Sequence, residues 1–248
     1  MRLPKVLDEL ASFGTHERST WEMIARRLRD GGDLPRTKRG HGAGHVTASD
    51  LATLVIAGMG ASSAVEASAV VKRLRALSAN PCKIDVRRYA PALLDLPQPI
   101  KVPASMRPVE AVVRQRTFGQ AMDALMANGP MIHKALTAYA ETKSRLVDTD
   151  QQRDAVRKHI FEVALTINGP KPSASLWFQE RHVLSGPEAD NHYPFDRTEY
   201  TLYHGMWGFS ALPDRLDEEH LGWTSQTVLD ARAIFRLAAL VQNDEATA

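Results

Sequence analysis

The chain has 248 residues, of which 44% are hydrophobic and 24% are charged. This composition is typical of a soluble globular chain with one large or two ordinary domains, and it excludes collagen-like, coiled-coil and wholly disordered proteins. The net charge of +2 conceals an uneven distribution, because residues 1–116 carry a net +8 and residues 117–248 a net −6. A basic half favours contact with nucleic acid or a membrane surface. Chance segregation of charge within a single domain is the alternative.

The sequence also disfavours secretion, insertion into a membrane and sites that depend on several cysteines. The N-terminal segment lacks the apolar run of a signal peptide, and no stretch reaches the roughly eighteen apolar residues of a membrane span. Cys82 is the single cysteine, so an internal disulfide framework and a cysteine-based zinc finger are excluded. We therefore expect a cytoplasmic protein.

Two short amphipathic helices are predicted at the N-terminus. Apolar residues fall at helical spacing over Leu3–Ala11, and Gly14 ends that segment. A second apolar stripe covers Trp21–Leu28 and stops at Asp30–Gly32. Two such helices joined by a tight glycine-containing turn form the helix-turn-helix pattern. Four side chains of the second helix project away from its apolar stripe: Ser19, Met23, Arg26 and Arg27.

A short, basic and glycine-rich segment at residues 34–46 separates this pair from the next predicted helix. Thr47 followed three residues later by Asp50 is typical of a helix N-cap with acidic support for the first turn. An apolar run begins at Leu51, and residues 62–78 predict one further helix with a basic end.

The order of helix, turn, helix, basic loop and capped helix resembles the winged helix-turn-helix of the MerR-like regulators. Residues 28–35, the wing-like residues 36–45 and residues 47–56 carry the resemblance, which covers about a quarter of the chain. The family's usual Arg-Tyr before the threonine is replaced here by His45 and Val46, and its long dimerising coiled coil is not seen in the sequence. The resemblance implies a DNA-binding module, of the kind that phage and prophage regulators carry on unrelated partner domains.

Basic side chains on a helix and an adjoining loop neutralise phosphates and release counterions, and glycines let a loop approach the sugar-phosphate backbone. In this interpretation the exposed side chains of the second helix enter or border the major groove. The loop meets the backbone or the minor groove through Arg36, Lys38, Arg39, His41 and His45. A solvated helix face is the alternative for each arginine.

Two other functions for the loop are disfavoured. Gly40, Gly42 and Gly44 match neither the Rossmann nor the P-loop spacing, and no apolar strand precedes them. A metal site at His41 and His45 would need a helix through three glycines, and no acidic partner is in reach. We therefore expect no cofactor and no metal.

Six of the fourteen prolines fall between positions 81 and 108. Such a stretch cannot hold a long helix. It predicts a stiff, extended linker at residues 79–108 between an N-terminal domain of residues 1–78 and a C-terminal domain of residues 109–248. The alternative is a long ordered connection laid across one larger domain, with a short helix at residues 89–94.

The C-terminal half predicts helices followed by strands. Phe118–Leu125, ended by Asn128 and Gly129, and Met131–Tyr139 after Pro130 predict a helical hairpin. The period then changes to two over residues 161–167 and 174–178, which predicts a β-hairpin. Residues 198–207 predict a third strand, and residues 224–241 a closing helix capped by Thr224 or Ser225. The predicted fold class is α+β, mostly helical, with a β-hairpin or small antiparallel sheet.

An enzyme is the weaker hypothesis for this half. Histidines and carboxylates gather around residues 186–196, but no HExxH or GxSxG motif occurs there. We expect no catalytic residues. An acidic half with a mixed architecture is suited to oligomerisation, to holding a partner such as RNA polymerase, or to sensing a small molecule.

The leading hypothesis is a sequence-specific transcriptional regulator that binds double-stranded DNA through residues 1–78. Residues 109–248 would form a homodimer or contact the transcription machinery, because one short recognition helix seldom gives adequate specificity alone. A phage-type structural or packaging protein similar to a small terminase subunit is the first alternative. A DNA-tethered enzyme is the second.

Overall fold

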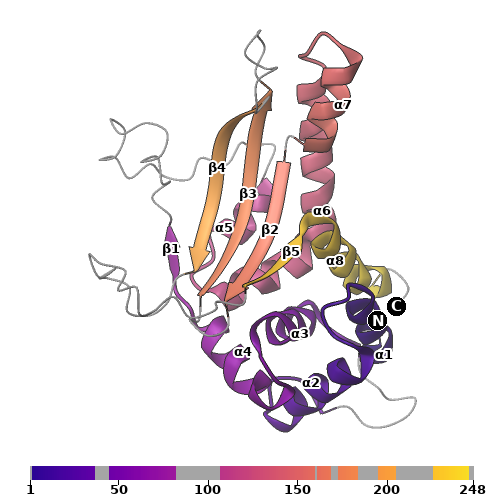
Figure 1. Cartoon of the computed structure of the whole chain (residues 1–248), viewed down its shortest axis with the longest axis vertical. Helices are drawn as coiled ribbons and strands as arrows, with labels where there is room; N and C mark the ends of the chain where they lie inside the picture. Colours follow the sequence, from indigo (N-terminus) through magenta and orange to yellow (C-terminus); the bar gives the residue numbers. More distant parts are fainter. Residues whose placement is uncertain are drawn as a thin grey trace.

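A computed structural model describes residues 2–36, 45–81, 107–159, 161–168, 173–183, 195–204 and 226–245 (Figure 1). Within these ranges the chain is mostly helical and contains one antiparallel sheet. The N-terminal helices are α1 (Leu3–Ser12), α2 (Arg18–Asp30), α3 (Ala48–Gly60), the 3-10 turn η1 (Ala64–Glu66) and α4 (Ala67–Arg75). The later helices are α5 (Arg107–Val113), α6 (Phe118–Ser144), α7 (Asp150–His159) and α8 (Ala231–Glu245).

The sheet contains five strands in the order β1-β4-β3-β2-β5. They are β1 (Ala79–Pro81), β2 (Phe161–Asn168), β3 (Ser173–Val183), β4 (Phe195–His204) and β5 (Gln226–Asp230). The sequence predicts a hairpin at residues 161–178, and here β2 and β3 pair antiparallel with Leu165 opposite Leu176. The third strand, predicted at residues 198–207, corresponds to β4, which pairs with β3 and begins three residues earlier than predicted. Residues 205–207 lie outside the described residues.

The N-terminal helices begin and end where the sequence predicts. α1 stops two residues before Gly14, which has a left-handed φ of 75°. The Thr47 hydroxyl accepts a hydrogen bond from the Asp50 amide at 3.1 Å, and the Asp50 carboxylate accepts one from the Thr47 amide at 2.9 Å. This reciprocal capping fixes the start of α3. The helix predicted within residues 62–78 is split between η1 and α4.

α3 lies at the centre of the molecule. Every residue from Leu51 to Gly60 is buried, and α3 contacts α2, α4, α6, α8 and the strands β2 and β5. Its sequence contains no charged residue after Asp50. A helix that is apolar on all sides is stable only when other elements cover all of its faces, and α3 lies among these helices and strands in Figure 1.

Residues on both sides of the proposed linker share one hydrophobic core. One cluster of buried hydrophobic side chains, continuous in space, includes residues from Val6 of α1 to Val241 of α8. Gly60 of α3 shows the close packing, because an added Cβ would lie 2.6 Å from Leu74 of α4 and 3.2 Å from Ile167 of β2. The expected boundary between residues 1–78 and 109–248 therefore does not divide the core. β1 occupies the first linker positions and pairs with β4, and residues 82–106 lie outside the described residues.

The helical hairpin predicted over residues 118–139 is wrong, because α6 runs unbroken from Phe118 to Ser144 with Pro130 inside it. Proline removes one backbone donor but has a φ compatible with a helix. The Asn128 side-chain amide donates to the carbonyl of Ala124 at 2.8 Å, so this polar side chain is satisfied within the helix. Gly129 is buried against α8, where a Cβ would lie 2.2 Å from that of Ala238. This packing outweighs the local sequence signals at Asn128, Gly129 and Pro130, which favour the end of a helix.

The closing helix predicted at residues 224–241 is wrong in its first part. β5 occupies Gln226–Asp230 and pairs antiparallel with β2, so α8 begins only at Ala231. Its first turn is capped by Asp230, whose carboxylate accepts a hydrogen bond from the Ala233 amide at 2.9 Å. The predicted caps Thr224 and Ser225 lie outside the described residues.

Replacing Gly129 with alanine should lower the free energy of unfolding by up to about 2 kcal/mol. Alanine favours an isolated helix over glycine by about 1 kcal/mol, but the new methyl would meet Ala238 at 2.2 Å, and overpacking a tight contact costs about 1–3 kcal/mol. Urea unfolding of the two proteins measures the difference. A more stable variant would show that α6 and α8 do not pack at Gly129.

Candidate nucleic-acid interface

The candidate interface is centred on the exposed face of α2. Ser19, Met23, Arg26 and Arg27 are all exposed, with Met23 at 53%. The opposite face is buried through Trp21, Ile24, Ala25 and Leu28. The division into two faces is therefore the one that the helical periodicity predicts. Among the described residues, no helix is long and apolar enough to cross a membrane.

The free positive charge of α2 lies toward its C-terminal end. Arg18 near the start is neutralised by Asp8 of α1 at 2.6 Å and by Glu22 at 2.7 Å. Arg26 and Arg27 form no ion pair with any described residue. Both guanidinium groups are therefore available to an anionic ligand, whereas that of Arg18 is not.

Lys72 of α4 extends this basic end, which the sequence does not predict. Its ammonium lies 3.3 Å from the carbonyl oxygen of Gly31 and 3.9 Å from Asp33, and its side chain is 61% exposed. The Ser68 hydroxyl donates to the same Asp33 carboxylate. These contacts hold the turn after α2 against α4, so the two helices present their charges together. The only sequence signal was the basic end predicted for residues 62–78.

The ends of the basic loop are fixed on the structure, although most of the loop is not described. Arg36 is exposed shortly after α2, and His45 is exposed where its backbone forms an antiparallel bridge with Arg2. Lys38, Arg39 and His41 lie outside the described residues. The loop thus leaves the end of α2 and returns beside the start of α1. Arg2, which is exposed, joins the candidate interface through this bridge.

Asp30 is an exposed carboxylate that the sequence-based list of site residues omits. At about 100° per residue, position 30 falls between Met23 and Arg26 in projection down the axis of α2. A carboxylate there repels phosphate. The interface is therefore basic in balance but contains an acidic group on the same face, at the C-terminal end of α2.

Trp21 fixes α2 on the buried helix α3. A Cβ on Gly58 would lie 1.9 Å from the indole ring, so only glycine admits this contact. His16 meets the same ring edge-on with centroids 5.4 Å apart, and its Nε2 lies at 2.7 Å from the carbonyl oxygen of Gly58. The exposed side chains of α2 are thus presented by a helix held in the core, as a precise recognition surface requires.

No protein-family model, curated protein or solved structure matches the chain. The MerR-like resemblance therefore has only the residues quoted for it as support. Among the described residues, no group of three or more His, Cys, Asp or Glu side chains is placed to hold a metal ion. Of the loop at residues 186–196, which prompted the enzyme hypothesis, residues 186–194 lie outside the described part of the chain, and Phe195 and Asp196 begin β4.

Proposed function

We propose that the protein is a transcriptional regulator that binds double-stranded DNA with the exposed face of α2. The observation that carries the proposal is the pair Arg26 and Arg27, which are exposed, unpaired among the described residues and presented by a helix anchored in the core. Exposed cations of this kind neutralise phosphates and read guanine edges.

The proposed contacts divide along α2. Ser19 and Met23 on its first turns face base edges, because recognition helices use their N-terminal residues for this purpose. Arg26, Arg27 and Lys72 contact phosphates or guanine. The segment from Arg36 to His45, which contains Lys38, Arg39 and His41, acts as a wing against the backbone or minor groove. A winged helix-turn-helix is the finer fold that this proposal requires.

A dimer completes the proposal, because a single short recognition helix rarely supplies sufficient specificity. The C-terminal half would provide the contact between subunits or with RNA polymerase. Two exposed apolar side chains of this half, Met131 at 51% and Leu146 at 74%, are available for such contacts.

The salt dependence of duplex binding tests the proposed function. If six to ten phosphates are neutralised, affinity should fall by about 10³–10⁵ between roughly 50 and 200 mM salt. Fluorescence anisotropy of a labelled duplex of about 30 base pairs measures this slope. An affinity that does not change with salt, or no binding at the lowest salt, would contradict the proposal.

Replacing Asp30 with asparagine should tighten DNA binding, by about threefold at physiological salt. The change removes an exposed negative charge that lies on the same face of α2 as Met23 and Arg26, and it retains the size of the side chain. Asp148→Asn is the matched control, because Asp148 is exposed after α6 and remote in sequence from α2. Equal effects of the two substitutions would indicate a response to net charge only, and an unchanged affinity of the Asp30 variant would place Asp30 outside the interface.

A further inference from the structure

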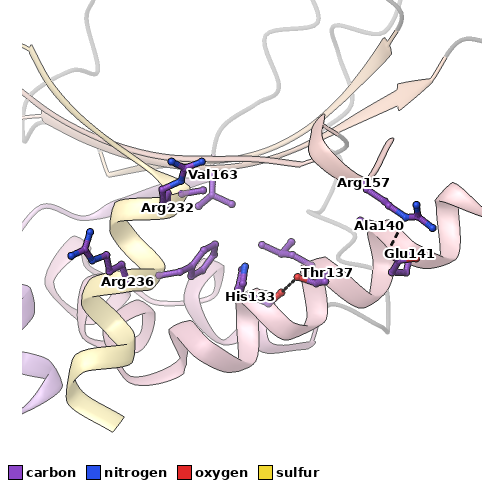
Figure 2. Close-up of a pocket in the computed structure, with 11 residues that line it drawn as sticks. His133, Thr137, Ala140, Glu141, Arg157, Val163, Arg232 and Arg236 are labelled. Atoms are coloured by element: carbon purple, nitrogen blue, oxygen red, sulfur yellow. Dashed lines mark hydrogen bonds and ion pairs between the residues drawn. The ribbon is translucent and has the colours of Figure 1, made fainter. Parts of the chain in front are cut away.

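A pocket of about 510 Å³ lies between α6, α7, α8 and β2, remote in sequence from the candidate DNA interface (Figure 2). Pockets for small molecules commonly measure about 300–1,000 Å³. Many of its lining side chains, among them His133, Thr137 and Arg232, are exposed, so the pocket opens to solvent. Its size and access therefore suit a small organic ligand.

The pocket lies beside a close contact between α6 and α8. They meet at Gly129 and Ala238, where an added Cβ would lie 2.2 Å from the facing one. The lining residues nearest to this contact are His133 of α6, one turn after Gly129, and Arg236 of α8, two residues before Ala238. Successive turns of α6 then contribute Thr137 and Glu141. Close packing at the glycine thus fixes the width of the pocket.

The middle of the pocket is apolar. Leu136 and Ala140 of α6 and Val163 of β2 are buried there, and Ala231 and Phe235 of α8 line it as well. The Phe235 and His133 rings lie against each other with centroids 5.2 Å apart. The Thr137 hydroxyl donates to the carbonyl of His133 at 2.9 Å and is thereby satisfied within α6. An apolar ligand body would gain free energy by displacing water from this surface.

Among the described residues around the pocket, one arginine has no anionic partner. Arg157 is paired at 3.0 Å with Glu141, which is the one carboxylate among the described lining residues. Arg236 is paired with Glu9 of α1 and lies over the Phe13 ring at 5.5 Å. Arg232 forms no hydrogen bond or ion pair with any described residue. Figure 2 shows Arg232 beside Val163 at one end and the Arg157–Glu141 pair at the other.

We propose that this pocket binds an organic anion with a single carboxylate and an apolar body. Arg232 receives the carboxylate, because a guanidinium matches it with two parallel hydrogen bonds. The apolar body lies along Phe235, Leu136 and Val163. One unbalanced guanidinium favours a monocarboxylate over a more highly charged phosphate. This site is independent of the proposed DNA-binding function.

Isothermal titration calorimetry tests the proposal with two carboxylates, octanoate and 2-naphthoate, and with the primary amide of each. The full-length protein should bind at least one carboxylate about tenfold or more tightly than its amide, because a charge-assisted hydrogen bond is absent from the neutral compound. Arg232→Gln should abolish this preference while leaving the melting temperature unchanged. Lys134→Gln, which removes an exposed cation of α6 that does not line the pocket, should preserve it.

A second variant separates the pocket from the rest of the surface. Thr137→Trp should block carboxylate and amide alike, because the larger side chain would fill the space between α6 and α8 without disturbing a buried contact. Equal affinity for a carboxylate and its amide, a preference that survives Arg232→Gln, or binding that survives Thr137→Trp would each overturn the proposal. No binding of either carboxylate below about 10 mM would overturn it as well.

Discussion

Replacing Arg26 and Arg27 together with alanine should weaken duplex DNA binding by about 30-fold or more at physiological salt. Each lost contact to a base or phosphate is worth about 1 kcal/mol or more, and removal of two phosphate contacts should also reduce the salt slope by about 2. Both side chains are exposed and unpaired among the described residues, so the free energy of unfolding should change by less than about 0.5 kcal/mol. Anisotropy titrations and urea unfolding measure the two quantities.

The matched control replaces Lys134 and Arg145 with alanine, which removes the same net charge from exposed positions of α6 and its C-cap. This variant should retain nearly the full affinity, because general electrostatic attraction is screened over about 8 Å at physiological salt. If both double variants weaken binding equally, the effect comes from net charge. If the Arg26 and Arg27 variant binds as the natural protein does, α2 is not the recognition helix.

Replacing Trp21 with alanine should lower the free energy of unfolding by about 3–5 kcal/mol. The indole ring is 2% exposed and fills the space between α2 and α3, and loss of a large buried aromatic side chain leaves a cavity as well as unburied apolar surface. Urea unfolding measures the loss, which is large against the usual stability of a domain.

Substitutions at Gly58 test whether the indole ring of Trp21 lies against α3 at this position. In the natural protein Gly58→Ala should destabilise by about 1–3 kcal/mol, because the new methyl would overlap the indole at 1.9 Å. In the Trp21→Ala background the same change should stabilise by up to about 1 kcal/mol, because alanine is the better helix former and the obstacle is absent. The same sign in both backgrounds would contradict the contact between Trp21 and Gly58.

The N-terminal helices could be predicted because their signals are local. An apolar stripe at helical spacing fixes which side of α2 is buried, so exposure of Arg26 and Arg27 follows from the sequence. The cap at Thr47 and Asp50 involves residues only three positions apart. Such short-range features do not depend on the rest of the fold.

The errors arise where distant residues decide the structure. α6 continues through Asn128 and Pro130 because Gly129 packs against Ala238, more than a hundred positions later. β5 forms because β2 offers it an edge to pair with, and strand preference depends strongly on such context. The role of Lys72 likewise depends on α4 lying beside the end of α2.

The proline-rich segment favours two domains, whereas the apolar character of α3 on all sides favours a core shared by the two halves of the chain. α3 has no polar stripe from Leu51 to Gly60, so it needs neighbours on all sides. The two helices that flank it in the N-terminal part cannot supply them alone, and α6, α8 and β2 complete its surroundings. The all-round apolar character of α3 is therefore the local evidence for a shared core.

Selection of bound sequences from a pool of random DNA duplexes at about 150 mM salt tests the central claim most directly. A dimeric regulator that reads DNA with α2 should enrich an inverted repeat whose half-sites are about one helical turn apart, and the Arg26 and Arg27 variant should lose that enrichment. A pool that remains random after repeated rounds with the natural protein would contradict sequence-specific DNA binding by this chain.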